Sequence, residues 1–306
     1  MLKKTILALF LSSASAAFAL PFHSQHAIVY EEGSGKVLLE KDPNAVVSIA
    51  SLTKLMTAMV VLDARQDLNE SIDIEESDVD TVKHSSSRVP VGAVLPRQTV
   101  LQLALMSSDN RAAAALARTY PGGRTAFLAA VQHKIRSLDM RSTVIEEPTG
   151  LSPHNRSTAA DLVKMATAAS HYPEIVRLTT NTEDEVDMNG RLVHFRNTNR
   201  LVGKPDWDIQ LSKTGFTREA GRCLIMRMKA AGKNVVVVLL NARDSLARMA
   251  DAENVLRHLE GRPTAMTVAA QAPAPAKVST RHRVKRKAHG ATTKMADKRT
   301  AKQRRV

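Results

Sequence analysis

Apolar and polar residues alternate near both ends of the chain in patterns that predict two β-hairpins. Residues 27–32 and 36–42 form the first pair of strand-like runs, and residues 222–229 and 234–241 form the second. A glycine-containing turn connects the two runs of each pair. The run at 234–241 is almost continuously apolar, which is typical of a strand in the middle of a sheet.

The segment between these hairpins has a mainly helical pattern. Residues 51–65 are apolar on every side, which predicts a helix buried within the domain, and Ser48 is a candidate N-cap. Because the first and last strands can share one antiparallel sheet with the helices as a second layer, the sequence predicts an α+β fold. Further helices are expected at residues 99–107, 111–118, 159–170 and 244–260.

Ser51 and Lys54 open the buried helix and indicate nucleophilic chemistry. They are three residues apart, so their side chains share one face of the first turns. Free backbone N–H groups and the positive end of the helix dipole lie beside Ser51. A lysine in such apolar surroundings is desolvated, which lowers its pKa and favours the neutral amine that can accept the serine proton. Taken alone, the same spacing also fits a capping serine followed by a surface lysine.

Two more short motifs follow in the order expected of an acyl-transfer enzyme with a serine nucleophile and a lysine base. Residues 108–110 (SDN) lie between two predicted helices, where Asp and Asn favour a turn that points side chains into a cleft. Residues 213–215 (KTG) end a short extended run, and the glycine allows substrate backbone to approach closely. Each motif alone also fits an ordinary turn or strand end, so the prediction depends on their combination.

The charge of the chain is distributed unevenly and divides it into three segments. Residues 1–19 have a basic start, an apolar core and a small-x-small ending at Ala19, which predicts a secretory signal peptide cleaved after that residue. Residues 20–261 have no net charge and a length suited to one large domain. Residues 262–306 contain 13 Lys and Arg and one acidic residue, and they contribute most of the formal charge of +14. We therefore expect an exported, periplasmic protein, and no other stretch is apolar enough to form a transmembrane segment.

The basic tail at 262–306 is rich in Ala, Pro, Thr, Lys and Arg, so we expect it to be disordered. Basic tails often bind nucleic acid, but export argues against that partner. An anionic envelope polymer, such as a phosphorylated glycolipid or carboxylate-rich wall, fits the charge better. A solvated tail that has no partner explains the same composition.

Other chemistries find little support in the sequence. Cys223 is the only cysteine, so no internal disulfide can form, and its place in a predicted strand favours a buried, inert thiol. The ten histidines do not follow a metal-ligand spacing such as H-E-x-x-H. We therefore expect no metal ion and no other cofactor.

The motifs and their surroundings resemble the low-molecular-mass penicillin-binding proteins, a family of serine D,D-peptidases, and among them the D-alanyl-D-alanine endopeptidases of the penicillin-binding protein 7 type. The resemblance is carried by residues 49–65, 101–118, 147–156 and 209–222, and it covers most of residues 24–260. It implies a β-lactamase/transpeptidase-like fold, with a five-stranded antiparallel sheet and a cluster of helices around the serine helix.

The resemblance also implies catalytic roles for four residues. Ser51 would be the acylated nucleophile, and Lys54 would be the general base that deprotonates it. Ser108 would pass a proton to the leaving amine, and Asn110 would hold Lys54 and the substrate amide in place. Water would then hydrolyse the acyl-enzyme.

Four further residues would bind the substrate. Lys213 would supply positive potential, and Thr214 would hydrogen-bond the carboxylate side of the bound peptide. Gly215, which has no side chain, would let the backbone of the substrate approach closely. Backbone N–H groups of Phe216 and Ser51 would hold the oxyanion. The implied substrate is the D-alanyl cross-link of peptidoglycan, and β-lactams would acylate the serine as mimics of that substrate.

Three alternatives stay open at this point. A D,D-carboxypeptidase would remove terminal D-alanine, although such enzymes usually continue into a second β-domain and an amphipathic anchor. A class A β-lactamase needs a carboxylate that activates the deacylating water, but Glu147-Pro148 is followed by Thr149-Gly150-Leu151 instead of the expected acid-Leu-Asn. A non-catalytic wall-binding protein would not need every catalytic position filled.

Overall fold

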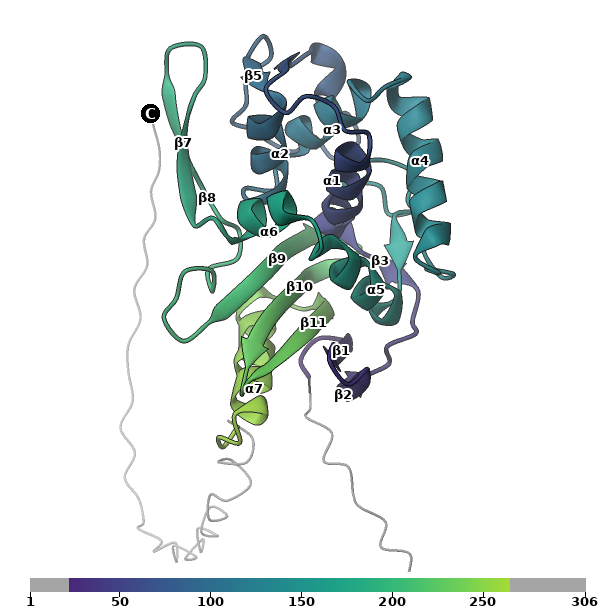
Figure 1. Ribbon diagram of the computed structural model, residues 1–306, viewed down its shortest axis with the longest axis vertical. Coiled ribbons are helices and arrows are strands. Elements are labelled where there is room, and N and C mark those ends of the chain that lie inside the picture. The colour runs from purple at the N-terminus through teal and green to yellow at the C-terminus, as the bar shows by residue number, and fades with distance from the viewer. Residues whose placement is uncertain (1–21, 265–306) are drawn as a thin grey trace, which may run out of the picture.

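The computed structural model describes residues 22–264, and their largest sheet is five-stranded and antiparallel (Figure 1). Its strands are β1 (His26–Glu31), β2 (Lys36–Lys41), β9 (Asp208–Thr217), β10 (Gly221–Ala230) and β11 (Lys233–Ala242). The strand order is β2-β1-β11-β10-β9, so the first two strands of the chain pair with the last three. Val29 of β1 lies opposite Val237 of β11, and both predicted hairpins are confirmed.

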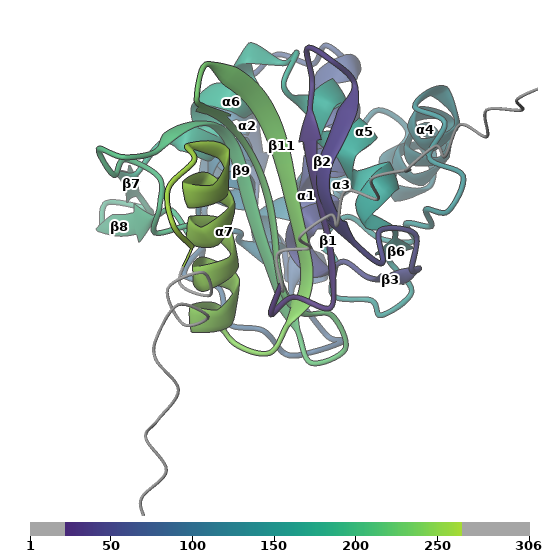
Figure 2. The same ribbon diagram turned by 90° about the horizontal axis from the view of Figure 1, so that it is seen from below.

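Side chains of β11 alternate between two hydrophobic cores, one on each face of the sheet. Val236 and Val238 pack into the larger core on the helical side. Val235 and Val237 pack into the smaller core, which α7 (Ser245–Leu259) covers from the opposite face (Figure 2). All four side chains are fully buried. Burial on both faces explains why the central strand is a continuous apolar run.

Helix α1 (Thr53–Asp63) runs through the middle of the helical layer (Figure 1). Every residue from Thr53 to Val61 is buried, as the apolar pattern predicts for a helix enclosed on all sides. The other helices of this layer are α2 (Arg97–Leu105), α3 (Asn110–Arg118), α4 (Gly123–Ser137), α5 (Ala159–Ala169) and α6 (Pro173–Thr180).

Three small antiparallel strand pairs connect these elements. They are β3 (Val47–Ser48) with β6 (Arg156–Ser157), β4 (Ser71–Asp73) with β5 (Val94–Pro96), and β7 (Glu183–Asp187) with β8 (Leu192–Arg196). The β3–β6 pair brings the loop before β6 beside the start of the serine segment, where Ile49 N donates to Asn155 O at 3.1 Å. The β7–β8 hairpin projects from the body beside α2 and α6 (Figure 1).

Three details differ from the sequence expectations. Ser48 is not a helix N-cap, because it lies in β3 and its Oγ donates to Pro153 O at 2.7 Å. Ser51 lies in a 3-10 turn, η1 (Ala50–Leu52), which precedes α1 instead of forming its first turn. The extended run before Lys213 does not end there, since β9 continues to Thr217 and pairs with β10 along its length.

Within residues 22–264, no helix has both the length and the hydropathy that crossing a membrane requires. The expected signal peptide at 1–19 and nearly all of the basic tail at 262–306 lie outside the described residues.

Candidate active site

A strained turn places Ser51 at the edge of a cleft. Its neighbour Ala50 has a φ of +47°, a left-handed conformation that costs a non-glycine residue about 1–3 kcal/mol. Thr53 Oγ1 donates to the Ala50 carbonyl oxygen at 2.8 Å and so ties the turn to α1. Gly150 packs directly against the same peptide group, because a Cβ added at Gly150 would lie 1.9 Å from Ala50 O. The surrounding structure therefore fixes the serine in place.

The amine of Lys54 lies at the centre of the site. Its Nζ is 3.0 Å from Ser51 Oγ, 2.7 Å from Asn110 Oδ1 and 2.7 Å from the carbonyl oxygen of Thr149. The side chain is only 1% exposed. Burial lowers the pKa of Lys54 to about 8, and nearby carboxylates, Glu147 foremost, oppose that shift. The amine is therefore still mostly protonated at pH 7, but its neutral fraction is far larger than that of an ordinary lysine.

The neighbours of Lys54 also orient the neutral amine. A neutral amine has two N–H bonds and one lone pair. Asn110 Oδ1 and the Thr149 carbonyl oxygen can only accept hydrogen bonds, so they take the two N–H groups. The lone pair is left facing the hydroxyl of Ser51. This is the geometry that a base needs to remove the serine proton.

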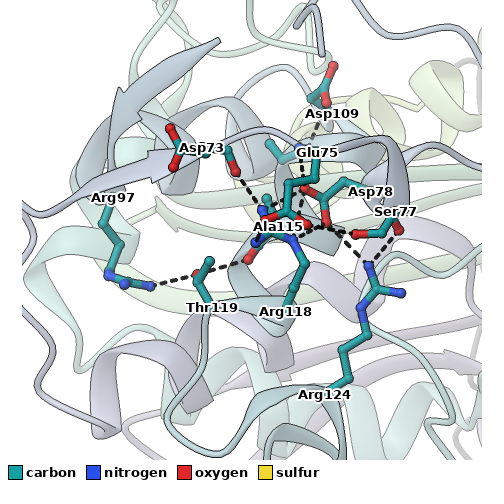
Figure 3. A network of polar contacts seen from close by, with 11 residues as sticks. Asp73, Glu75, Ser77, Asp78, Arg97, Asp109, Ala115, Arg118, Thr119 and Arg124 are labelled. Carbon is teal, nitrogen blue, oxygen red and sulfur yellow. Dashed lines mark hydrogen bonds and ion pairs between the residues drawn. The ribbon is translucent and has the colours of Figure 1, made fainter. Parts of the chain in front are cut away.

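A network of charged residues holds the segment that supports Asn110 (Figure 3). Arg118 of α3 binds both carboxylate oxygens of the buried Asp78, and Arg124 reaches the same carboxylate at 3.2 Å. This fixes residues 75–82 against α3, and Asp80 within them accepts the N–H of Ser85 at 2.8 Å.

Ser85 then connects this network to the site. Its Oγ accepts a hydrogen bond from Asn110 Nδ2 at 2.8 Å, which turns Asn110 Oδ1 toward Lys54. Asn110 is the first residue of α3, and Asp109 caps that helix by accepting the N–H of Ala112 at 3.0 Å.

Ser108 lies in the predicted break between α2 and α3, with a φ of +61°. Its Oγ accepts a hydrogen bond from Lys213 Nζ at 2.8 Å, which links the SDN and KTG motifs. The Lys213 pKa lies well below its usual value because of burial first, and then because of the charges on Lys54 and Arg248. This direction argues against a permanent charge on Lys213, whereas donation to Ser108 needs only one N–H and is available in both protonation states.

Strand β9 forms the wall opposite Ser108. Thr214 Oγ1 donates to Thr198 Oγ1 at 2.7 Å. Gly215 lies against the serine turn, since a Cβ added there would be 3.2 Å from Ser51 N. The absence of a side chain at Gly215 lets the backbone of Gly215 and Phe216 approach the backbone N–H of Ser51 closely. This is the region where two N–H groups of an oxyanion hole must converge.

A cleft of about 540 Å³ extends from Ser51 past Thr214, and no Asp or Glu lines it among the described residues. Arg200, Arg222 and Arg248 are among its lining residues. Arg248 is 7% exposed, donates to a backbone carbonyl, and has a buried Nε with no hydrogen-bond partner within residues 22–264. The lining of the cleft therefore favours an anionic group.

The carboxylate of Glu147 is occupied by its own loop. It accepts hydrogen bonds from the backbone N–H groups of Thr149 and Gly150 at 2.7 and 2.6 Å, and from Asn155 Nδ2 at 2.9 Å. These contacts fix the loop that presents the Thr149 carbonyl to Lys54. Glu147 is therefore an anchor of this loop.

The structure brings all the sequence-predicted site residues together around one cleft. They are Ser51, Lys54, Ser108, Asn110, Lys213, Thr214, Gly215 and Phe216. Sequence reasoning did not assign roles to Ser85, Thr149 or the three arginines. Thr149 lies in the stretch 147–156 that carries part of the family resemblance, but its contribution is a backbone carbonyl, so its side chain gave no signal.

Cys223 is fully buried in β10, as predicted, and burial raises the pKa of its thiol to about 11, which disfavours the reactive thiolate. Among residues 22–264, no cluster of three or more His, Cys, Asp or Glu side chains could hold a metal ion.

The fold and the site define a serine hydrolase whose base is a buried amine. A family model described as D-alanyl-D-alanine carboxypeptidase, peptidase family S11, matches residues 13–244. The chain belongs to this family of serine D,D-peptidases.

Curated relatives and solved structures agree with this assignment. A D-alanyl-D-alanine endopeptidase of Pseudomonas aeruginosa is 46% identical over 252 residues, which cover 81% of each chain. The D-alanyl-D-alanine endopeptidase of Escherichia coli is 43% identical over 251 residues, again 81% of each chain. The Streptomyces K15 DD-transpeptidase is similar with a TM-score of 0.74 and 25% identity, covering 79% of this chain and 99% of that one. The predicted β-lactamase/transpeptidase-like fold is therefore confirmed.

The contact between Gly150 and the serine turn leads to a testable expectation. In Gly150→Ala the added methyl group would lie 1.9 Å from the carbonyl oxygen of Ala50, and residue 150 would have to keep a φ of +86°. The loop or the turn must therefore move. We expect a loss of about 2–4 kcal/mol in the free energy of unfolding, from clash and backbone strain. Labelling of Ser51 by a fluorescent penicillin should slow at least about tenfold, which corresponds to a rise of about 1.4 kcal/mol in the activation barrier.

Gly190→Ala is the matched control, because Gly190 has the same left-handed φ of +85° but no neighbour that a Cβ would meet within 4 Å. It should cost only about 1–2 kcal/mol and leave the labelling rate unchanged. Equal effects of the two substitutions, measured by urea unfolding and labelling, would show that the contact with the serine turn is unimportant.

Proposed function

We propose that this protein is a serine D,D-endopeptidase that hydrolyses D-alanyl cross-links of peptidoglycan and that penicillins acylate on Ser51. The observation that carries the proposal is the 3.0 Å distance between Ser51 Oγ and a buried lysine amine whose pKa is lowered to about 8. The names of the relatives from Pseudomonas aeruginosa and Escherichia coli support the choice of substrate.

Acylation begins when the neutral amine of Lys54 accepts the proton of Ser51. Oγ forms a bond to the carbonyl carbon of the D-alanyl residue, and the oxyanion accepts hydrogen bonds from the backbone N–H groups of Ser51 and Phe216. The C–N bond then breaks. Ser108, hydrogen-bonded to Lys213, relays the proton held by Lys54 to the leaving nitrogen, so that the amine departs neutral and Lys54 is neutral again before deacylation.

Deacylation uses the same groups in reverse. A water molecule gives a proton to Lys54 and attacks the ester carbon, and Ser51 leaves with a proton returned from the amine. Asn110 and the Thr149 carbonyl keep the amine in position through both halves of the reaction.

The carboxypeptidase alternative has weaker support. The D-alanyl-D-alanine carboxypeptidase of Bacillus subtilis is 28% identical, and the match covers 62% of that longer protein. The two endopeptidases are more similar, and the match covers 81% of each. The β-lactamase alternative requires a carboxylate free to activate water, whereas Glu147 is held by five donors of its own loop.

The proposed location is the periplasm. It rests on the composition of residues 1–19, with a basic start, an apolar core and a cleavage signature at Ala19. The proposed substrate lies in the same compartment.

Products of defined wall fragments test the proposed activity. The purified protein should convert a cross-linked peptide dimer into two monomers, with a mass gain of one water per cleavage. It should release D-alanine from uncross-linked pentapeptide more slowly. Ser51→Ala should abolish both dimer cleavage and covalent penicillin labelling, because the nucleophile is gone, while the midpoint of urea unfolding stays nearly unchanged.

Each alternative has a distinct result in this experiment. Release of D-alanine from pentapeptide without dimer cleavage indicates a carboxypeptidase. Rapid loss of the penicillin adduct indicates a β-lactamase. An unlabelled parent protein indicates a wall-binding protein without catalysis.

The lowered pKa of Lys54 predicts a pH dependence. The amine must be neutral to act as a base, so the second-order rate of penicillin acylation should rise about tenfold per pH unit well below the Lys54 pKa. The rise should level off near pH 8, where the pKa of Lys54 lies. Stopped-flow labelling between pH 5.5 and pH 9 checks this, and a rate that is constant or falls over the range contradicts the role of Lys54.

We also propose that the basic segment 262–306 binds an anionic envelope polymer, which its excess of Lys and Arg supports. A variant that lacks residues 265–306 should lose co-sedimentation with phosphate-rich wall polymer at low salt, because its positive charges are removed. Penicillin labelling should be unchanged. Equal co-sedimentation of the two proteins means that the tail has no such partner.

A further inference from the structure

A second cavity, of about 830 Å³, adjoins the active-site cleft on its Thr214 side. Arg88, His194, Arg196 and Arg200 line it together with Ser107 and several asparagine and threonine residues. We call it the basic groove. The β7–β8 hairpin, which projects from the body in Figure 1, contributes His194 and Arg196 to the lining of the groove.

The basic groove is continuous with the active site. Thr198 and Arg200 line both cavities. Thr198 accepts the hydrogen bond from Thr214 at 2.7 Å, so the junction lies beside the KTG motif. Ser107, adjacent to Ser108, lines the groove from the other side. A peptide that extends beyond the leaving amine therefore has a path from the cleft into the groove.

The arginines of the groove are only partly neutralised. Arg196 pairs with the carboxylate of Glu183 at 3.4 Å, and His194 lies 3.3 Å from the same carboxylate and 3.9 Å from that of Glu185. Arg88 stacks on Phe195, with its guanidinium carbon 4.3 Å from the ring centroid. Neither Arg88 nor Arg200 has a carboxylate partner within residues 22–264, and both are exposed. Arg88 gives one N–H to the backbone carbonyl of His194, so its remaining N–H groups and the guanidinium of Arg200 are available to an anionic ligand.

Charge is separated across the active site. A third cavity, of about 320 Å³, shares Asn110 with the active-site cleft and no lining residue with the groove, and it is lined by several carboxylates, including Glu76, Asp80 and Glu146, and by a single arginine. An anionic strand is repelled there and attracted to the basic groove, where no Asp or Glu is among the lining residues.

From these observations we propose that the basic groove binds the amine-side peptide strand of the cross-link through the carboxylates of that strand. The proposal rests on the proposed endopeptidase function and assigns a specificity role to Arg88, Arg196 and Arg200. Terminal D-alanine is too small to reach beyond the cleft, so it gains nothing from the groove. A cross-linked strand gains charge-assisted hydrogen bonds there, which favours cross-links over terminal D-alanine as substrates.

Arg88 gives the clearest test, because it lines the basic groove and not the cleft. Arg88→Gln should raise the KM for a cross-linked dimer about fivefold, in line with an exposed charge pair worth about 1 kcal/mol. Arg88→Glu should raise it about twentyfold or more, because a like charge then faces the substrate. The KM for pentapeptide and the rate of penicillin labelling should stay within about twofold of the parent values for both variants.

Arg141→Gln is the matched control. Its side chain is 84% exposed, it loses the same charge, and it lines neither cavity. It should leave the KM for the dimer unchanged, which separates a local contact from a change in net charge.

The outcomes separate the two proposals. Selective loss of dimer affinity in the Arg88 variants supports the groove as a specificity site. An unchanged dimer KM, or a parallel loss on dimer, pentapeptide and penicillin, overturns the groove assignment while leaving the endopeptidase function intact. A parent protein that labels with penicillin but does not cleave the dimer overturns the proposed function itself.

Discussion

The enclosed amine of Lys54 is the constraint on which the rest of the structure depends. A charged or polar group without water needs partners, and this one takes them from three distant segments: the serine turn, the start of α3 and the loop before β6. Each partner is itself held by a second contact, from Thr53, Ser85 and Glu147 respectively. The chemistry and the packing of the helical layer therefore use the same hydrogen bonds.

The sheet also positions Ser51. Because β1 pairs with β11 in the middle of the sheet, β9 is left at one edge, where it can lie against the serine turn. Two glycines, Gly150 and Gly215, border that turn from the loop and from the strand. A side chain at either position would meet the backbone of residues 49–51, so the precise placement of Ser51 depends on two residues that have none.

Much of the fold and of the active site could be predicted from the sequence, because these features depend on residue type and spacing. The hairpins, the buried helix and the three motifs were predicted, and the structure brings the motifs together. Other features depend on backbone atoms and on contacts between distant segments. The Thr149 carbonyl has no side-chain signature, and the left-handed φ of Ala50 occurs where the peptide packs against Gly150, a contact between distant segments. Arg200 resembles any surface arginine until folding places it where two cavities meet.

The left-handed backbone at Ala50 and Ser108 has a consequence for adaptation. Both residues adjoin or carry a reactive hydroxyl, and both conformations are unfavourable for residues with a side chain. Substitutions that relax these two backbone conformations would raise the thermal stability of the protein, so selection for heat tolerance would favour them. The same changes would displace the hydroxyls, so resistance to heat and speed of turnover compete at these positions.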